Sequence, residues 1–263
     1  MRYIWQLVKN SFRMQATYRT ALLAGLLTNL FFGFLRAAVM LALYQGQTSV
    51  NGMSIGTAVS YVAVSQGLIA FLTIFGYFDV MRSVYSGDVA ADLIRPASLF
   101  TTWMGRDIGR SIVNLIVRGV LLMAIFSFFF DVVLPTSLLQ WVWIGFSLLL
   151  AWGISFCWRF LVNLASFWTP DATGVGRMAF ALSQLMCGFI LPLRLLPDWF
   201  THLANFTPFP SMMNSPVEIY LGILNGSQLF SAIFAQVLWL GLLYVVCRVV
   251  LAAGIKKLVI QGG

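Results

Sequence analysis

One polar segment, residues 79–110, places acids and arginines side by side between two long apolar stretches of the chain. The acids are Asp79, Asp88, Asp92 and Asp107, and the arginines are Arg82, Arg95, Arg106 and Arg110. Charged side chains gathered in one segment of an otherwise apolar chain are suited to contacting a partner. We therefore expect this segment to form a structured loop that touches something on one side of a membrane.

The rest of the sequence contains no motif that is typical of a catalytic site. There is no Gly-x-x-x-x-Gly-Lys-Ser/Thr phosphate loop, so we do not expect this chain to hydrolyse ATP itself. His202 is the single histidine, which excludes a His-Glu-x-x-His motif and makes a metal site or a catalytic triad unconvincing. The three cysteines, Cys157, Cys187 and Cys247, lie in apolar runs and are interpreted as small packing residues.

Composition places the chain among integral membrane proteins. It has 263 residues, of which 60% are hydrophobic and 9% charged, and its mean hydropathy is +0.89. Soluble domains carry about 25% charged residues, and no soluble fold could cover so much apolar surface. The net charge of +8 is spread over segment ends and forms no continuous basic face, which argues against nucleic-acid binding.

Six apolar segments are long enough, or nearly so, to cross about 30 Å of hydrocarbon as helices. They are Ala21–Tyr44, Gly56–Phe78, Ser111–Phe130, Leu138–Trp168, Arg177–Leu193 and Gln228–Ala253. The fifth is short and ends near Pro192, so we expect it to stop early or to lead into a re-entrant segment. The loops on one side and the two termini hold twelve lysines and arginines, whereas the other side holds one. The positive-inside rule therefore predicts that both termini are cytoplasmic.

Residues 1–18 are expected to form an amphipathic helix in the plane of the cytoplasmic membrane surface. At 100° per residue, Lys9 and Arg13 fall on a basic face, and Trp5 falls on the apolar side. This helix serves either as a simple topology anchor or also as a contact for a cytoplasmic partner.

Within the polar segment, residues 88–95 are predicted to form a helix of about two turns. Asp88 suits an N-cap, and Pro96 ends the helix at or before Arg95. Asp88 and Asp92 lie four residues apart on one side, while Val89 and Leu93 lie on the other. The helix is either a solvated loop helix or a helix that docks into a groove on a soluble partner.

The stretch 86–96, Ser-Gly-Asp-Val-Ala-Ala-Asp-Leu-Ile-Arg-Pro, is similar to a pattern found in a bacterial subgroup of ABC-2-type transporter permeases. The order of an in-plane helix, six spans and a helical loop after the second span also resembles this family. The resemblance implies an all-α membrane domain over residues 1–263, located in the bacterial cytoplasmic membrane. It further implies that the loop holds a coupling helix that contacts an ATPase, with this role falling on Asp88, Val89, Asp92, Leu93 and Arg95.

The resemblance also implies partners. Two ATPase subunits would hold ATP and magnesium. A second six-span permease, which is either a related but different chain or a second copy of this one, would complete the membrane part. Membrane lipid would surround the complex. The function implied is export of an amphipathic, drug-like or lipid-like substrate. An ATP-independent secondary transporter or channel is the alternative, and a membrane enzyme is a third class that lacks catalytic residues here.

Residues 193–227 are expected to form an external helical loop. Residues 198–206 alternate at helical spacing, and Ser215, Pro216 and Glu218 suit a capping box for a second short helix. Two short helices here resemble the external re-entrant helices of the family.

Three arginines, Arg36, Arg118 and Arg159, fall inside predicted spans, where charge is costly. Each is expected either to snorkel or contact another subunit, or to contact an anionic substrate or lipid. Arg36 lies in the outer half of its span, within reach of the outer headgroups. Because no acid falls at the centre of any predicted span, a buried ion-pair relay is not expected.

Overall fold

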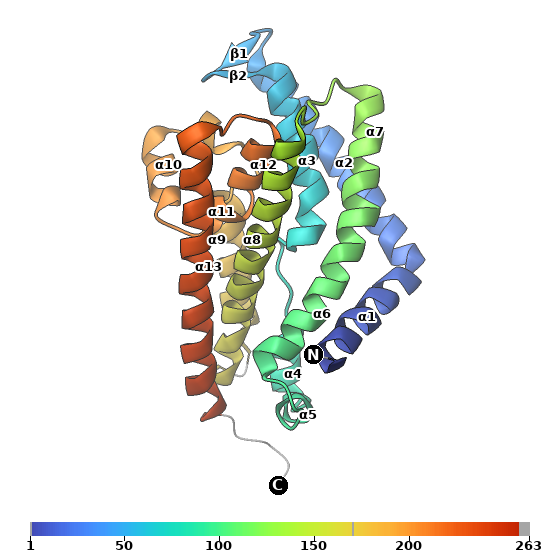
Figure 1. Ribbon diagram of the computed structural model, residues 1–263, viewed down its shortest axis with the longest axis vertical. Coiled ribbons are helices and arrows are strands. Elements are labelled where there is room, and N and C mark those ends of the chain that lie inside the picture. The colour runs from blue at the N-terminus through green and yellow to red at the C-terminus, as the bar shows by residue number, and fades with distance from the viewer. Residues whose placement is uncertain (1, 170, 258–263) are drawn as a thin grey trace.

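The computed structural model describes residues 2–169 and 171–257, which are helical almost throughout (Figure 1). The first part contains α1 (Arg2–Thr17), α2 (Arg19–Tyr44), the hairpin β1 (Ser49–Val50) and β2 (Met53–Ser54), α3 (Ile55–Leu72), α4 (Asp79–Tyr85) and α5 (Val89–Leu93). The middle contains α6 (Leu99–Asn114), the π-helix η1 (Leu115–Val120), α7 (Leu121–Phe129), α8 (Leu138–Asn163) and the 3-10 turn η2 (Leu164–Phe167). The last part contains α9 (Thr173–Met186), η3 (Leu193–Leu195), α10 (Asp198–Asn205), α11 (Phe209–Met212), α12 (Asn214–Tyr220) and α13 (Gly226–Ile255).

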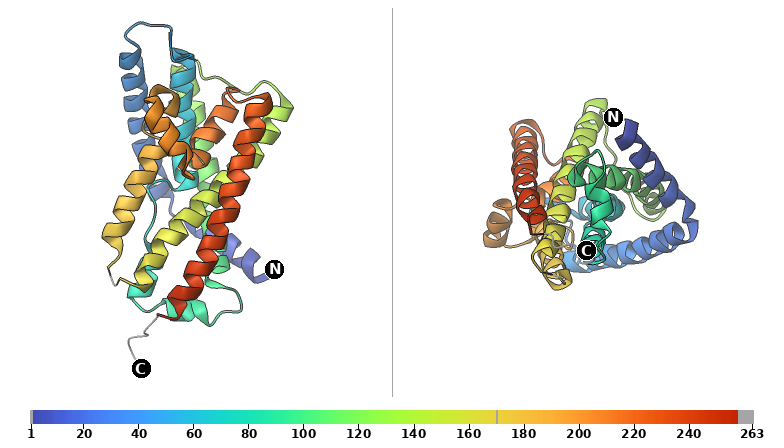
Figure 2. Two further views of the ribbon diagram at one scale, coloured as in Figure 1. Left: turned by 90° about the vertical axis from the view of Figure 1, so that its left-hand side faces the viewer. Right: turned by 90° about the horizontal axis from the view of Figure 1, so that it is seen from below.

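Five helices in the described part of the chain are long and apolar enough to cross a membrane. They are α2, α3, the continuous run α6–η1–α7, α8 with η2, and α13. The sixth predicted span is covered only in part, because α9 has 14 residues and so reaches about 21 Å. In Figure 2, α9 rises from the end of α8 to mid-height, and α10, α11 and α12 lie in the other half. Early termination of this segment was predicted.

Helix α3 lies at the centre of the bundle and is buried along most of its length. It contacts α2, the η1–α7 part of the third spanning helix, α8 and α12. Helix α13 packs along α8 on the side away from α1 and α2 (Figure 2). At one end of the bundle lie α4, α5 and the end of α13, and at the other lie the β-hairpin and α10 (Figure 1).

Two predicted boundaries are wrong. The second span was expected to reach Phe78, but α3 ends at Leu72. The third was expected to begin at Ser111, but α6 begins at Leu99, where Ser98 caps it by accepting a hydrogen bond from the Thr101 N–H at 3.2 Å. Charged residues lowered the apparent hydropathy of the first turns of α6, although the folded protein pairs these charges internally. Residues 99–110 of the predicted loop are therefore helical, as the first part of α6.

Helices α10 and α12 lie close to the predicted positions, with α11 between them. The capping box predicted at α12 does not form, since no side chain caps this helix. Glu218 turns instead to Arg194, whose Nε donates to Oε1 at 2.6 Å, and the Glu218 side chain is 5% exposed. An ion pair that buries the carboxylate thus replaces a local backbone hydrogen bond.

Candidate functional site

Helix α5 is held against α6 by an ion pair at Asp92. Both terminal nitrogens of Arg106 donate to the Asp92 carboxylate at 2.9 Å, and Arg95 adds a contact of 3.2 Å. Arg106 also lies over the ring of Trp103, 4.6 Å from its centroid. Because a bidentate guanidinium–carboxylate pair fixes orientation as well as position, α5 cannot turn on α6 without breaking it.

The outer face of α4 and α5 is exposed and mixed in character. Ile94 is 85% exposed and Tyr85 is 77% exposed. Asp88 and Ala91 are exposed beside them. An acidic group among exposed apolar side chains at the tip of a loop is suited to contact with a protein partner.

The acidic face predicted for this helix does not form. Helix α5 has five residues, fewer than two turns, and Asp92 is buried against α6 while Asp88 is exposed. Asp88 does not cap the helix, and its carboxylate accepts a hydrogen bond from the Ser86 hydroxyl at 2.7 Å. Val89 belongs to the buried core and Leu93 packs against it, as predicted for the apolar side.

Helix α1 packs against α6 along a strip that two glycines keep flat. A Cβ at Gly105 would touch Ile4 and Leu7, and one at Gly109 would overlap the carbonyl oxygen of Val8. Glycines four residues apart lie on one helix face, and they allow two helices to approach backbone to backbone. Helix α1 therefore packs closely against α6, the helix that also holds α5 through the Asp92–Arg106 pair.

Several side chains of α1 outside this strip are exposed. Trp5 is 67% exposed, and Lys9 and Arg13 are exposed on the side away from α6. Near the start of α1, the Tyr3 hydroxyl accepts a hydrogen bond from Arg95 at 3.4 Å, which raises the pKa of Arg95. The helix is confirmed, whereas its placement in the membrane plane stays a prediction.

A groove of about 1040 Å³ opens between α4, α5, α6 and the start of α9. Hydrogen bonds from Thr173 lower the pKa of Asp171 at its edge, so this group is an anion at neutral pH. The charged lining consists of Asp79, Asp88, Asp92, Asp171, Arg82, Arg95, Arg106 and Arg177. The groove therefore offers both signs of charge next to the exposed face of α5.

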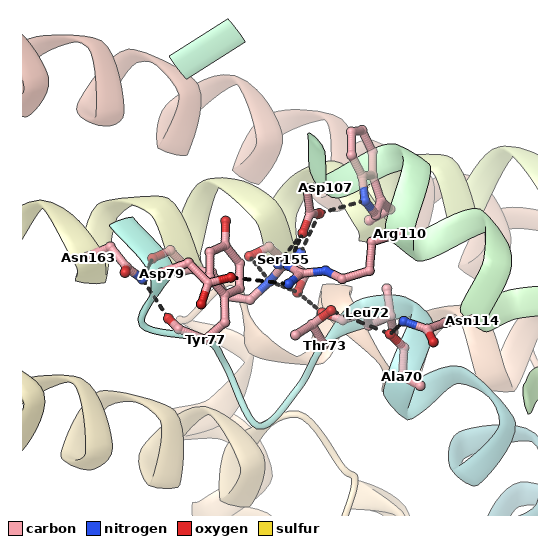
Figure 3. Close-up of polar contacts among 12 residues, drawn as sticks. Ala70, Leu72, Thr73, Tyr77, Asp79, Asp107, Arg110, Asn114, Ser155 and Asn163 are labelled. Carbon is pink, nitrogen blue, oxygen red and sulfur yellow. Dashed lines mark hydrogen bonds and ion pairs between the residues drawn. The ribbon is translucent and has the colours of Figure 1, made fainter. Parts of the chain in front are cut away.

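A buried ion pair lies deeper in α6, at Asp107 (Figure 3). The two terminal nitrogens of Arg159 donate to its two carboxylate oxygens at 2.8 and 3.0 Å, Arg110 donates at 2.8 Å and the Trp152 indole N–H at 3.0 Å. The Asp107 and Arg159 side chains are each 1% exposed. The sequence pointed to no acid near Arg159, yet the structure pairs it with Asp107, so Arg159 neither snorkels nor is free to reach a partner or substrate, whereas the expectation that no ion-pair relay exists stays a prediction.

The same network extends to the start of α4. Arg110 lies between Asp107 and Asp79 in Figure 3, and it contacts Asp79 at 3.5 Å. Asn163 of α8 donates to the Tyr77 carbonyl at 2.8 Å and accepts from the Met81 N–H at 3.1 Å. The entry to the polar loop is thus tied to two spanning helices.

Sequence reasoning missed Asp107 and Asn163 as members of this network, although a signal was present. Ser155, Arg159 and Asn163 recur every four residues along an otherwise apolar segment. Such spacing puts three polar groups on one helix face, and that face must find partners in the protein interior.

Arg36 also turns inward. It donates to Gln66 at 2.9 Å, to Ser65 at 3.3 Å and to the Phe189 carbonyl, and it lies over the Phe189 ring. It therefore does not extend to the outer headgroups as predicted, and within residues 2–169 and 171–257 no carboxylate pairs with it. Arg118 lies against α2.

Comparison with known proteins identifies the family. A family model described as "ABC-2 family transporter protein" matches residues 27–262, which is nearly the whole chain. The chain belongs to the ABC-2 transporter family. No individually curated protein and no solved structure shows a significant match.

Membership confirms the resemblance that the 86–96 stretch suggested. This ABC-2 protein is a multi-pass membrane protein of a permease family that lacks an ATPase domain. The match begins within α2, so α1 lies outside it.

Proposed function

We propose that this ABC-2 protein is the permease subunit of an ATP-binding cassette exporter. It moves an amphipathic, drug-like or lipid-like substrate out of the cytoplasm or the inner leaflet. Two separate ATPase subunits bind ATP and magnesium and hydrolyse the ATP. These subunits contact the exposed face of α4 and α5.

The anchorage of α5 is the observation that carries this proposal. Ala91 and Ile94 are exposed, and between them in the sequence lies Asp92, whose buried carboxylate pairs with Arg106. Arg106 belongs to a continuous helix of 31 residues, Leu99–Phe129. A force on the loop therefore acts on a spanning helix through a rigid contact, as ATP-driven transport requires.

The distribution of charge supports the orientation. The end that holds α4 and α5 also carries most of the loop and terminal arginines and lysines, and it is assigned to the cytoplasm of a bacterial cell. A second six-span permease, a related but different chain, completes the membrane part. Leu27, Phe31 and Leu35 form an exposed apolar stripe on α2 that is available to this partner or to lipid.

The alternative is a secondary transporter or channel that works without ATP. Such proteins use acids at membrane depth, and Asp107 is an acid in a spanning helix. Its carboxylate, however, accepts four hydrogen bonds from three side chains and is 1% exposed. A carboxylate with four hydrogen bonds and no access to water is not available to bind a transported ion. This supports a structural role for Asp107 and favours the exporter over the ATP-independent transporter.

Co-purification tests the proposal. The tagged chain, extracted from its native membrane in mild detergent, is expected to bring down a soluble protein with a phosphate loop. Ile94→Arg should reduce that recovery at least tenfold, while Leu203→Arg, a matched exposed position on α10 that is 50% exposed, should not. Equal recovery of the ATPase with both variants would contradict docking at α5, and recovery of the chain alone would favour the ATP-independent alternative.

A further inference from the structure

A small polar cavity lies between α1, α2, the end of α3 and the third spanning helix. Its volume is about 300 Å³, and its polar lining residues are Gln15, Asn29, Thr73, Tyr77, Arg110, Asn114 and Arg118. Figure 3 shows Thr73, Arg110 and Asn114 from this wall. The cavity is separate from the groove beside α5, and neither the exporter proposal nor the ion-pair network accounts for it.

Several polar atoms of this wall are buried without a partner among the residues that the structure describes. They are Asn29 Nδ2, the Tyr77 hydroxyl, Arg110 Nε, Arg118 Nε and Asn114 Oδ1. Asn114 is 6% exposed, and its amide nitrogen already donates to the Ala70 carbonyl at 3.3 Å. Buried polar groups are nearly always hydrogen-bonded, so a cluster of them around one cavity indicates a polar occupant.

The cavity also carries an excess positive charge. Arg110 is paired with Asp107 and Asp79. Arg118 has no carboxylate partner in the described part of the chain, and its one hydrogen bond there goes to the Ala21 carbonyl, at 3.3 Å. An unpaired guanidinium in a spanning helix favours an anionic group beside it.

Two features of the backbone place Arg118 at this wall. Asn114 immediately precedes the π-helix η1 and Arg118 lies within it, and local π-helices are frequent at functional sites. On α2, a Cβ at Gly25 would overlap the Arg118 guanidinium, so the glycine leaves the space that this side chain fills.

The depth of the cavity indicates the source of the anion. Gln15, in the last turn of α1, forms part of its rim. Helix α1 exposes Trp5 and Phe12 beside a basic face, as helices at the headgroup level do. With α1 in the predicted membrane plane, the cavity lies at the depth of the phosphate groups of the leaflet on the α1 side.

We propose that this cavity binds the headgroup of an anionic glycerophospholipid. Arg118 Nε and Asn29 Nδ2 donate to the phosphate oxygens, and Asn114 Oδ1 accepts from a headgroup hydroxyl. Phosphatidylglycerol supplies both an anionic phosphate and hydroxyl groups. The inference goes beyond the exporter proposal, because the site would bind this lipid whether the lipid stays bound to the protein or is the transported substrate.

Native mass spectrometry of the purified full-length chain in detergent tests the site, with phosphatidylglycerol or phosphatidylcholine added. The wild-type chain is expected to retain one phosphatidylglycerol at least tenfold more tightly than phosphatidylcholine, which lacks the hydroxyls and the net charge. Arg118→Gln should abolish this preference. Arg248→Gln, which removes an exposed arginine from α13, should preserve it.

Three results would overturn the proposal. They are equal retention of the two lipids, an equal loss in both variants, and displacement of the lipid by millimolar inorganic phosphate, which would identify a site for a free anion. Arg118→Lys keeps the charge and should keep part of the preference, which separates lost binding from lost folding. No ATPase is present in this assay, so its failure leaves the exporter proposal standing.

Discussion

Replacing Asp107 by asparagine tests the buried network most severely. The change keeps the shape of the side chain but removes the negative charge that faces Arg159, which is 1% exposed and cannot reach water. Removing one partner of a buried ion pair costs about 3–5 kcal/mol, because the other charge stays buried alone. For a domain of this size, a loss of this amount lowers the melting temperature by roughly 6–20 °C.

Thermal stability of the purified chain, followed by size-exclusion chromatography after heating, measures this effect. Asp88→Asn is the control, since Asp88 is exposed and accepts a hydrogen bond only from Ser86. A double variant, Asp107→Leu with Arg159→Met, removes both charges and is expected to be more stable than Asp107→Asn. A loss of about 1 kcal/mol lowers the melting temperature of a domain of this size by at least about 2 °C. The reasoning is therefore refuted if the melting temperatures of Asp107→Asn and Asp88→Asn differ by less than about 2 °C.

Three further predictions concern the contacts around the network. Asp92→Asn breaks the pair that anchors α5 and should speed amide hydrogen exchange in α5 roughly tenfold, about 1.4 kcal/mol, whereas Asp88→Asn should leave it unchanged. Gly109→Ala should displace α1 from α6, seen as faster proteolysis of α1, while Gly145→Ala, where a Cβ meets nothing within 4 Å, should have no such effect. Glu218→Gln removes the negative charge that faces the partly exposed Arg194, and it should lower the free energy of unfolding by about 1 kcal/mol, measured by thermal melting. A larger loss of stability than that of Asp107→Asn would contradict the ranking of Asp107 as the more costly charge to remove.

The sequence predicted the apolar helices well because hydropathy and length decide them. The cores of five spans, the separate helix α1 and the positions of α10 and α12 follow from apolar runs, an amphipathic pattern and the placement of prolines. An early end of this segment was also predicted, from Pro192, although α9 already ends at Met186, two residues before Gly188 in the left-handed region at φ +80°.

The loop and the candidate site were predicted less well, for one physical reason. A hydropathy scale gives each charged side chain the value for full exposure to water. Arg106 and Asp107 were therefore assigned to a loop, although they lie in α6. Whether Asp92 faces solvent or α6 depends on a partner 14 residues away, and Asp107 pairs with Arg159 52 residues away. Local spacing can mark a polar helix face, as at Ser155, Arg159 and Asn163, but it does not say which distant residue pairs with that face.

Site-directed crosslinking tests the central claim, that a separate ATPase contacts the exposed face of α5. Ala91→Cys places a thiol on that face, and Ser227→Cys places an exposed thiol at the start of α13, a helix whose other end lies at the same end of the bundle as α4 and α5 (Figure 1). The three native cysteines are buried, so they give little background. In native membranes, the account predicts that a thiol crosslinker joins Ala91→Cys, but not Ser227→Cys, to a soluble protein with a phosphate loop. Crosslinking of that protein to Ser227→Cys alone, or to neither position in membranes that contain it, would contradict the account.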